Sequence, residues 1–164
     1  MADQLSCDSH DLWDRSAKVV AWNGESRSAR VCQPRKQELD ELRAVVRRDL
    51  TDAALPALSE DRRFATAYNA ALQVARMATA SAGYRVAAVP GHHALSFECA
   101  GLALGKQADQ LVLFFDGCRR KRNVIDYTGV QIATSTEAAE LLQRAREFSA
   151  LVDAWIKNAH PRLS

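Results

Sequence analysis

The 164-residue sequence has no apolar run near the roughly 20 residues that a membrane-spanning helix requires. Its first ten residues also lack the basic and apolar regions of a secretory signal peptide. We therefore expect a cytoplasmic protein with no membrane partner.

Glycine, proline and paired cysteines are scarce as well. The 7 glycines and 4 prolines argue against disorder and against a fold with many tight turns. The 4 cysteines show none of the short paired spacings typical of zinc or redox sites, so we expect reduced thiols and neither a metal nor a cofactor. Cys99 and Cys118 lie in apolar helical patterns, which predicts that they are buried.

A strong charge of one sign is also missing. The net charge of +2 and the pI of about 8.4 are too mild to indicate a nucleic-acid partner, because phosphate binding requires clustered positive charge. The chain is instead rich in alanine and leucine, with 48% hydrophobic and 26% charged residues. This composition and the length predict one globular, helix-rich domain.

Apolar residues recur every three or four positions along most of the chain after Pro34, which is the pattern of amphipathic helices. Ser59 is a predicted N-cap, Gly83 a predicted helix terminator, and Thr134 with Glu137 a predicted capping box. The predicted helices span about 35–53, 59–83, 92–105, 107–127 and 134–155.

Helices joined mainly by short loops predict an all-α fold: an antiparallel four- or five-helix bundle of up-down topology with a shorter third helix. We expect residues 35–164 to form this bundle and residues 1–34 to form an N-terminal arm or short helix. Residues 84–91 are predicted to be a loop, and no strand is expected anywhere.

The most informative segment is the run of four basic residues at 119–122, near the end of the fourth predicted helix. Successive helical residues turn by about 100°, so the run fans around the helix instead of forming one patch. Arg122 falls in the apolar row of this helix, where an unpartnered guanidinium is costly. Arg119 lies one turn earlier and Asp126 one turn later on nearly the same face. We predict an Arg, Arg, Asp cluster at one end of the bundle.

This cluster has two interpretations. In the functional one, Arg119 and Arg122 bind a phosphate, with Asp126 or Tyr127 beside it. In the structural one, Arg122 and Asp126 form an ion pair that fixes helix register, while the other basic residues are solvated. The sequence pattern leaves both open.

His92 and His93, at the start of the third predicted helix, are a second candidate for phosphate or RNA binding. Adjacent histidines diverge by about 100° on a helix, and no other ligand spacing accompanies them, so we expect no metal site. A packing or capping role is favoured over that of a general base, although the imidazole pKa would suit a base.

With these features in place, residues 35–164 resemble the HEPN (higher eukaryotes and prokaryotes nucleotide-binding) domain, a helical family frequent in prokaryotic toxin and defence systems. The resemblance rests on the helix order, the Gly-His-His start of the third helix and the basic run of the fourth. Many HEPN ribonucleases combine an Arg and a polar residue with a nearby His. Here Arg122 and Asn123 are followed by Asp126 and Tyr127 instead, as in HEPN subgroups with an Arg, three residues, Asp, Tyr ending.

The resemblance implies an RNA- or nucleotide-binding protein, acting as a metal-independent endoribonuclease toxin in a toxin–antitoxin or defence system, with an antitoxin as partner. The implied catalytic residues are Arg122, Asp126 and Tyr127, and the implied phosphate- or RNA-binding residues are Arg119, Arg122, Asn123, His92 and His93. An alternative is a noncatalytic regulatory partner of a nucleotidyltransferase, with Tyr127 as modification acceptor. A third is a purely structural interaction module.

We also expect a two-fold homodimer in which the fourth helices approach each other near Arg122. A single cluster offers too few groups to hold an extended phosphate chain, and a symmetric interface would double them. Phe114 or Phe115 is expected to supply the apolar contact.

Overall fold

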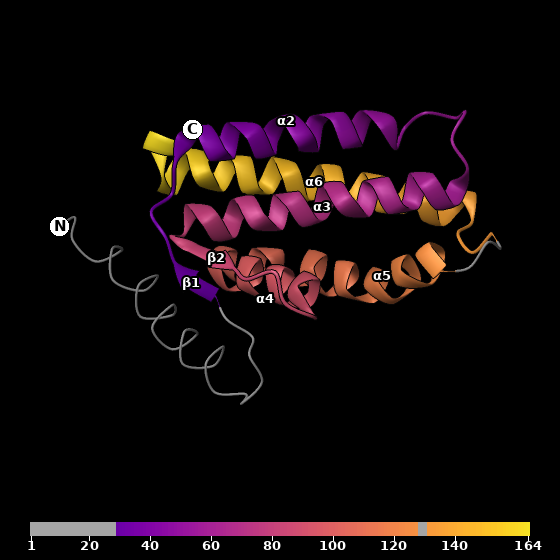
Figure 1. Cartoon of the computed structure of the whole chain (residues 1–164). Coiled ribbons are helices and arrows are strands. Elements are labelled where there is room, and N and C mark those ends of the chain that lie inside the picture. The colour runs from indigo at the N-terminus through magenta and orange to yellow at the C-terminus, as the bar shows by residue number, and fades with distance from the viewer. Residues whose placement is uncertain (1–28, 128–130) are drawn as a thin grey trace.

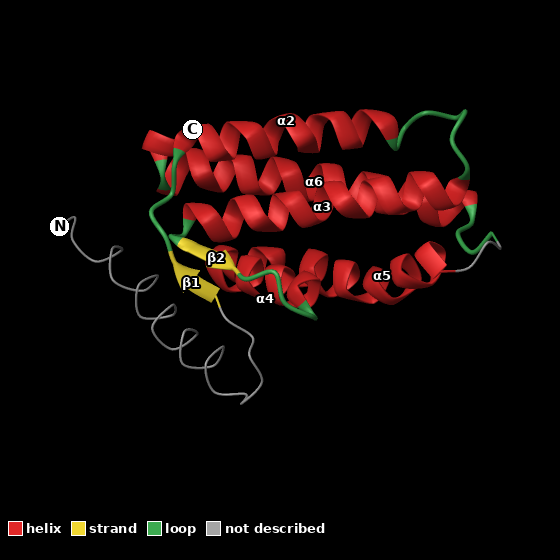
Figure 2. Cartoon of the chain, in the orientation of Figure 1, coloured by secondary structure: helices red, strands yellow, loops and turns green. Residues whose placement is uncertain are grey.

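The computed structural model describes residues 29–127 and 131–164, and this part of the chain is predominantly helical, which confirms the all-α prediction (Figure 2). The helices are α2 (Lys36–Asp52), α3 (Glu60–Ser81), α4 (His92–Leu104), α5 (Asp109–Tyr127) and α6 (Ser135–Ala159), with 3₁₀ turns at Gly105–Ala108 and Pro161–Leu163. The strands are β1 (Ala29–Val31) and β2 (Tyr84–Val86). The predicted N-terminal arm lies, up to residue 28, outside the described residues.

Helix α3 runs through the middle of the bundle. It contacts α2 and α6 on one side and α4 and α5 on the other (Figure 1). Small residues line α3 where it packs against these neighbours, and Ala67, Ala71, Ala75 and Ala78 are all fully buried.

The long helices α2, α3, α5 and α6 alternate in direction along the bundle (Figure 1). After α3 the chain doubles back past β2, so that the short α4 starts near the middle of the bundle and runs antiparallel to α5. This path brings the first turn of α4 beside the middle of α5 (Figure 1).

The expectation that the chain has no strand was wrong. β1 and β2 pair antiparallel, with Arg30 opposite Arg85. Gly83, at φ +88°, turns the chain out of α3 as predicted, and its carbonyl accepts a hydrogen bond from the Cys32 amide at 2.8 Å. Strands of three residues are too short to show the alternation of apolar and polar residues that identifies a strand. Their pairing also joins segments about 50 residues apart in the sequence, so no local pattern predicts them.

The predicted helix caps are confirmed. The Ser59 side chain accepts a hydrogen bond from the Arg62 amide. Thr134 and Glu137 form a complete capping box at the start of α6.

The aromatic core fastens α5 to the bundle. Phe115 is fully buried, with its ring centroid 5.3 Å from those of both Phe97 on α4 and Phe148 on α6.

Cys99 is buried as predicted, whereas Cys118 is only half-buried. Among the described helices, none combines the length and the apolar character that crossing a membrane would require.

Candidate functional site

Arg122 occupies the inward row of α5, as the sequence predicted. Its side chain is 30% exposed and forms an ion pair with Asp126 one turn later. The Arg122 Nε atom, however, is buried and has no hydrogen-bond partner in the described part of the chain. An N–H of a guanidinium that is removed from water without an acceptor is costly, so an incoming acceptor would be favoured there.

The other basic residues of the run have different surroundings. The Arg119 Nε donates to Asp116 Oδ1 at 3.0 Å. Lys121 forms an ion pair with Glu137 and lies 5.9 Å from the Phe64 ring centroid, so its charge holds α5 to α6 and α3. Arg120 is exposed, and so is Asn123.

Tyr68 of α3 is the functional candidate that the sequence did not indicate. The residue is 1% exposed, and its hydroxyl oxygen is buried without a hydrogen-bond partner among the described residues. Burial raises the pKa of Tyr68, and the positive charges of Arg119 and Arg122 act on it in the opposite direction. The hydroxyl is therefore protonated at neutral pH, a buried donor close to two guanidinium groups. In the sequence, Tyr68 stands among apolar residues at helical spacing, a pattern typical of a core residue.

The histidines of α4 lie beside this tyrosine. The His93 ring centroid is 5.8 Å from that of Tyr68 and 4.4 Å from that of His92. Burial lowers the pKa of His93 to about 4, and the charges of His92 and Arg122 contribute in the same direction. His93 is therefore neutral at pH 7 and packs against the core, as the favoured interpretation predicted. His92 instead places its Nδ1 atom 2.9 Å from the Val89 carbonyl oxygen.

Four side chains from three helices are thus linked: the rings of Tyr68 of α3 and His93 of α4 are in contact, and the charges of Arg119 and Arg122 of α5 act on both. We call this the Tyr–His–Arg cluster. It unites the two segments that the sequence had offered as separate candidates. Tyr127 is not part of it, because its side chain is 90% exposed and does not turn back toward the arginines.

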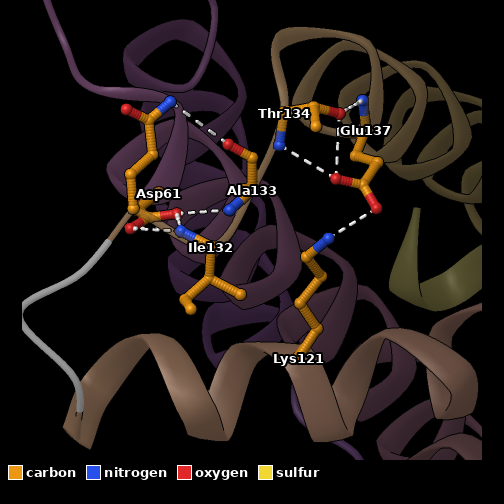
Figure 3. Close-up of polar contacts among 7 residues, drawn as sticks. Asp61, Lys121, Ile132, Ala133, Thr134 and Glu137 are labelled. Atoms are coloured by element: carbon orange, nitrogen blue, oxygen red, sulfur yellow. Dashed lines mark hydrogen bonds and ion pairs between the residues drawn. The ribbon is translucent and has the colours of Figure 1, made fainter.

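Polar contacts hold the start of α6 to α3 and to α5 (Figure 3). The Asp61 carboxylate accepts hydrogen bonds from the backbone amides of Ile132 and Ala133, the latter at 2.6 Å, and so fixes the chain entering α6. The hydrogen bond from Lys121, followed by those from Thr134, lowers the pKa of Glu137 to about 2. Of these contacts, the ion pair of Lys121 with Glu137 involves α5, the helix that carries Arg119 and Arg122.

Two further expectations concern a metal site and the residues of a dimer contact. Within the described ranges, no group of three or more His, Cys, Asp or Glu side chains is arranged to hold a metal ion. The suggestion that Phe115 supplies a dimer contact was wrong, because that ring is completely buried inside its own bundle. Phe114 is half-buried and Leu113 is 75% exposed, so these two remain available on the outer face of α5.

Tyr68→Phe should stabilise the protein. The substitution removes a buried hydroxyl without a described partner and keeps the ring, so we expect a gain of about 1–2 kcal/mol in the free energy of unfolding, measured by urea denaturation. Tyr84→Phe, at a half-buried tyrosine outside the cluster, serves as a comparison. A clear loss of stability in Tyr68→Phe would show that the hydroxyl is satisfied in solution.

Stability should also fall as the pH drops from about 6.5 to 4. His93 has its pKa lowered to about 4 in the folded chain, while the unfolded chain titrates near 6.5, so the unfolded state binds more protons between these values. For a partly exposed ring we expect about 1–2 kcal/mol from this source. His160, whose pKa burial also lowers, adds a slope of the same sign. Thermal unfolding of His93→Gln against pH should show a shallower decline, and an unchanged slope would contradict the assignment.

Comparisons with known proteins give this chain no relative. No family model matches it, and searches of the curated proteins and of the solved structures also find no match.

Proposed function

We propose that the Tyr–His–Arg cluster binds a phosphate of RNA, and that the protein is an RNA-binding protein of HEPN type. The observation that carries the proposal is that two buried donors, Arg122 Nε and the Tyr68 hydroxyl, have no hydrogen-bond partner among the described residues, and that the charges of Arg119 and Arg122 act on Tyr68. A phosphate oxygen would accept from both donors, while the guanidinium charges offset its own.

Cleavage of RNA through its 2′-hydroxyl requires a base near that hydroxyl, a cation on the phosphate and an acid for the leaving oxygen. In the proposed reaction, Arg119 and Arg122 supply the cation. His93, which is neutral at pH 7, and Asp126, whose carboxylate is paired with Arg122, are the two candidate bases. Such chemistry uses no metal, in keeping with the proposed endoribonuclease toxin. Binding is the part of the proposal that the geometry supports most directly.

The test is RNA binding and cleavage in the presence of EDTA. Arg122→Gln should weaken RNA affinity at least about tenfold, because hydrogen bonds to charged groups contribute about 1.5–3 kcal/mol. The matched control is Arg120→Gln on the same helix, whose exposed side chain should matter far less. Circular dichroism and thermal unfolding check that both variants fold. Equal affinity in the wild type and Arg122→Gln would favour the purely structural interpretation of the ion pair.

A second copy of the chain is the proposed partner at this site. Leu113, 75% exposed, and half-buried Phe114 lie on the outer face of α5, the helix that carries Arg119 and Arg122. A two-fold contact there would bring the α5 helices of two copies together. Sedimentation at micromolar concentration should show a dimer that Leu113→Glu dissociates. A monomer that still binds RNA through Arg122 would reject it.

The exposure of Tyr127 favours a second candidate function, that of a noncatalytic partner modified by a nucleotidyltransferase. At 90% exposure on the last turn of α5, the Tyr127 side chain is open to another enzyme. Intact-mass measurement after co-expression with a nucleotidyltransferase encoded beside this protein should show an added nucleotidyl group, which Tyr127→Phe abolishes. An unmodified wild-type mass would count against this function.

A further inference from the structure

A cavity of about 270 Å³ lies at the end of the bundle where β2 is found (Figure 1). Its lining comes from α2, α3, β2 and α4, and it includes Glu38, Leu42, Arg76, Ala80, Val86 and His92. The volume is just below the roughly 300 Å³ at which pockets for drug-sized ligands begin, so the cavity suits a small metabolite. Of the residues assigned above to RNA binding, only His92 lines it.

Glu38, which lines the cavity, has one carboxylate oxygen without a partner among the described residues. Its Oε1 atom accepts a hydrogen bond from Arg85 at 2.5 Å. Its Oε2 atom is buried and has no hydrogen-bond partner in the described residues. A buried carboxylate oxygen without a donor costs free energy, and a ligand N–H or ammonium group would remove that cost.

Arg76 gives the same cavity a cation. Its Nη1 atom donates to Gln73 at 3.3 Å, and a guanidinium carries five N–H donors in all, arranged to match a carboxylate. Arg85, the partner of Glu38 Oε1, also lines the cavity, and Leu42, Ala80 and Val86 give it an apolar wall. Opposite charges and an apolar wall around one small space match a compact zwitterion.

We propose that this cavity binds a free amino acid or a close analogue. The ligand's ammonium group would meet Glu38 Oε2, its carboxylate would meet Arg76, and its side chain would lie on the apolar wall. The proposal does not rest on RNA binding, because neither Arg119 nor Arg122 lines the cavity.

The first test is isothermal titration of the full chain with each standard L-amino acid at about 1 mM and above. We expect saturable binding of at least one. For that amino acid, N-acetylation of the ammonium or amidation of the carboxylate should each weaken binding at least about tenfold, since each removes a charged hydrogen bond. Absence of binding across the series overturns the proposal.

The second test uses paired variants. Glu38→Gln and Arg76→Met should each weaken binding of the same amino acid at least about tenfold. Glu98→Gln and Arg62→Met, at exposed positions on α4 and α3 outside the cavity, should leave it unchanged. Glu38→Asp keeps the charge and serves if Glu38→Gln does not fold. Affinity that is insensitive to both cavity variants would overturn the proposal. Arg122→Gln should weaken RNA binding and leave amino-acid binding intact. The RNA-binding proposal and the amino-acid proposal can therefore fail independently of each other.

Discussion

Phe115→Ala should cost about 3–5 kcal/mol in the free energy of unfolding, the usual range for truncating a buried phenylalanine. Phe115 is completely buried and is the only residue of α5 in that state, with rings of α4 and α6 on either side. The cavity left behind cannot close easily because three helices meet there. Urea denaturation followed by circular dichroism measures the loss.

Leu113→Ala is the matched control for this truncation. It lies on the same helix but is 75% exposed, so its effect should stay within about 0.5 kcal/mol. An outcome in which Phe115→Ala lowers the free energy of unfolding no more than this control does would contradict the prediction. The aromatic contacts of Phe115 would then not be what holds α5, and with it Arg119 and Arg122, against the bundle.

Asp61→Ala should cost at least about 2 kcal/mol. The Asp61 carboxylate accepts from the amides of Ile132 and Ala133, and removing it leaves those partly buried donors without their partner (Figure 3). Hydrogen bonds to a charged acceptor contribute about 1.5–3 kcal/mol. Urea denaturation measures the loss, and hydrogen exchange at Ile132 and Ala133 should become faster in the variant.

Glu60→Ala is the control at the neighbouring position. Its only described contact is a hydrogen bond from Gln131 at the long distance of 3.5 Å, so its loss should be small. Asp61→Asn, which keeps one acceptor oxygen, should fall between the two. A loss in Asp61→Ala no larger than in Glu60→Ala would mean that the entry to α6 is held by other contacts.

The sequence by itself determined the parts of this protein that depend on neighbours within one or two turns. Helical periodicity, the Ser59 cap, the Gly83 terminator and the Thr134 capping box all act within four residues, and each prediction is confirmed. The pairing of Arg122 with Asp126 belongs to the same class, because residues four apart share a helix face.

The tertiary structure alone decided which distant segments meet. The pairing of β1 with β2 and the burial of Phe115 between α4 and α6 depend on how whole helices pack. So does the Tyr–His–Arg cluster, in which Tyr68 lies about 50 residues from Arg119 in sequence and stands in a stripe that any core helix would show. The surroundings of a hydroxyl in such a stripe, and the charges that act on it, depend on long-range packing, and the local pattern does not encode that packing.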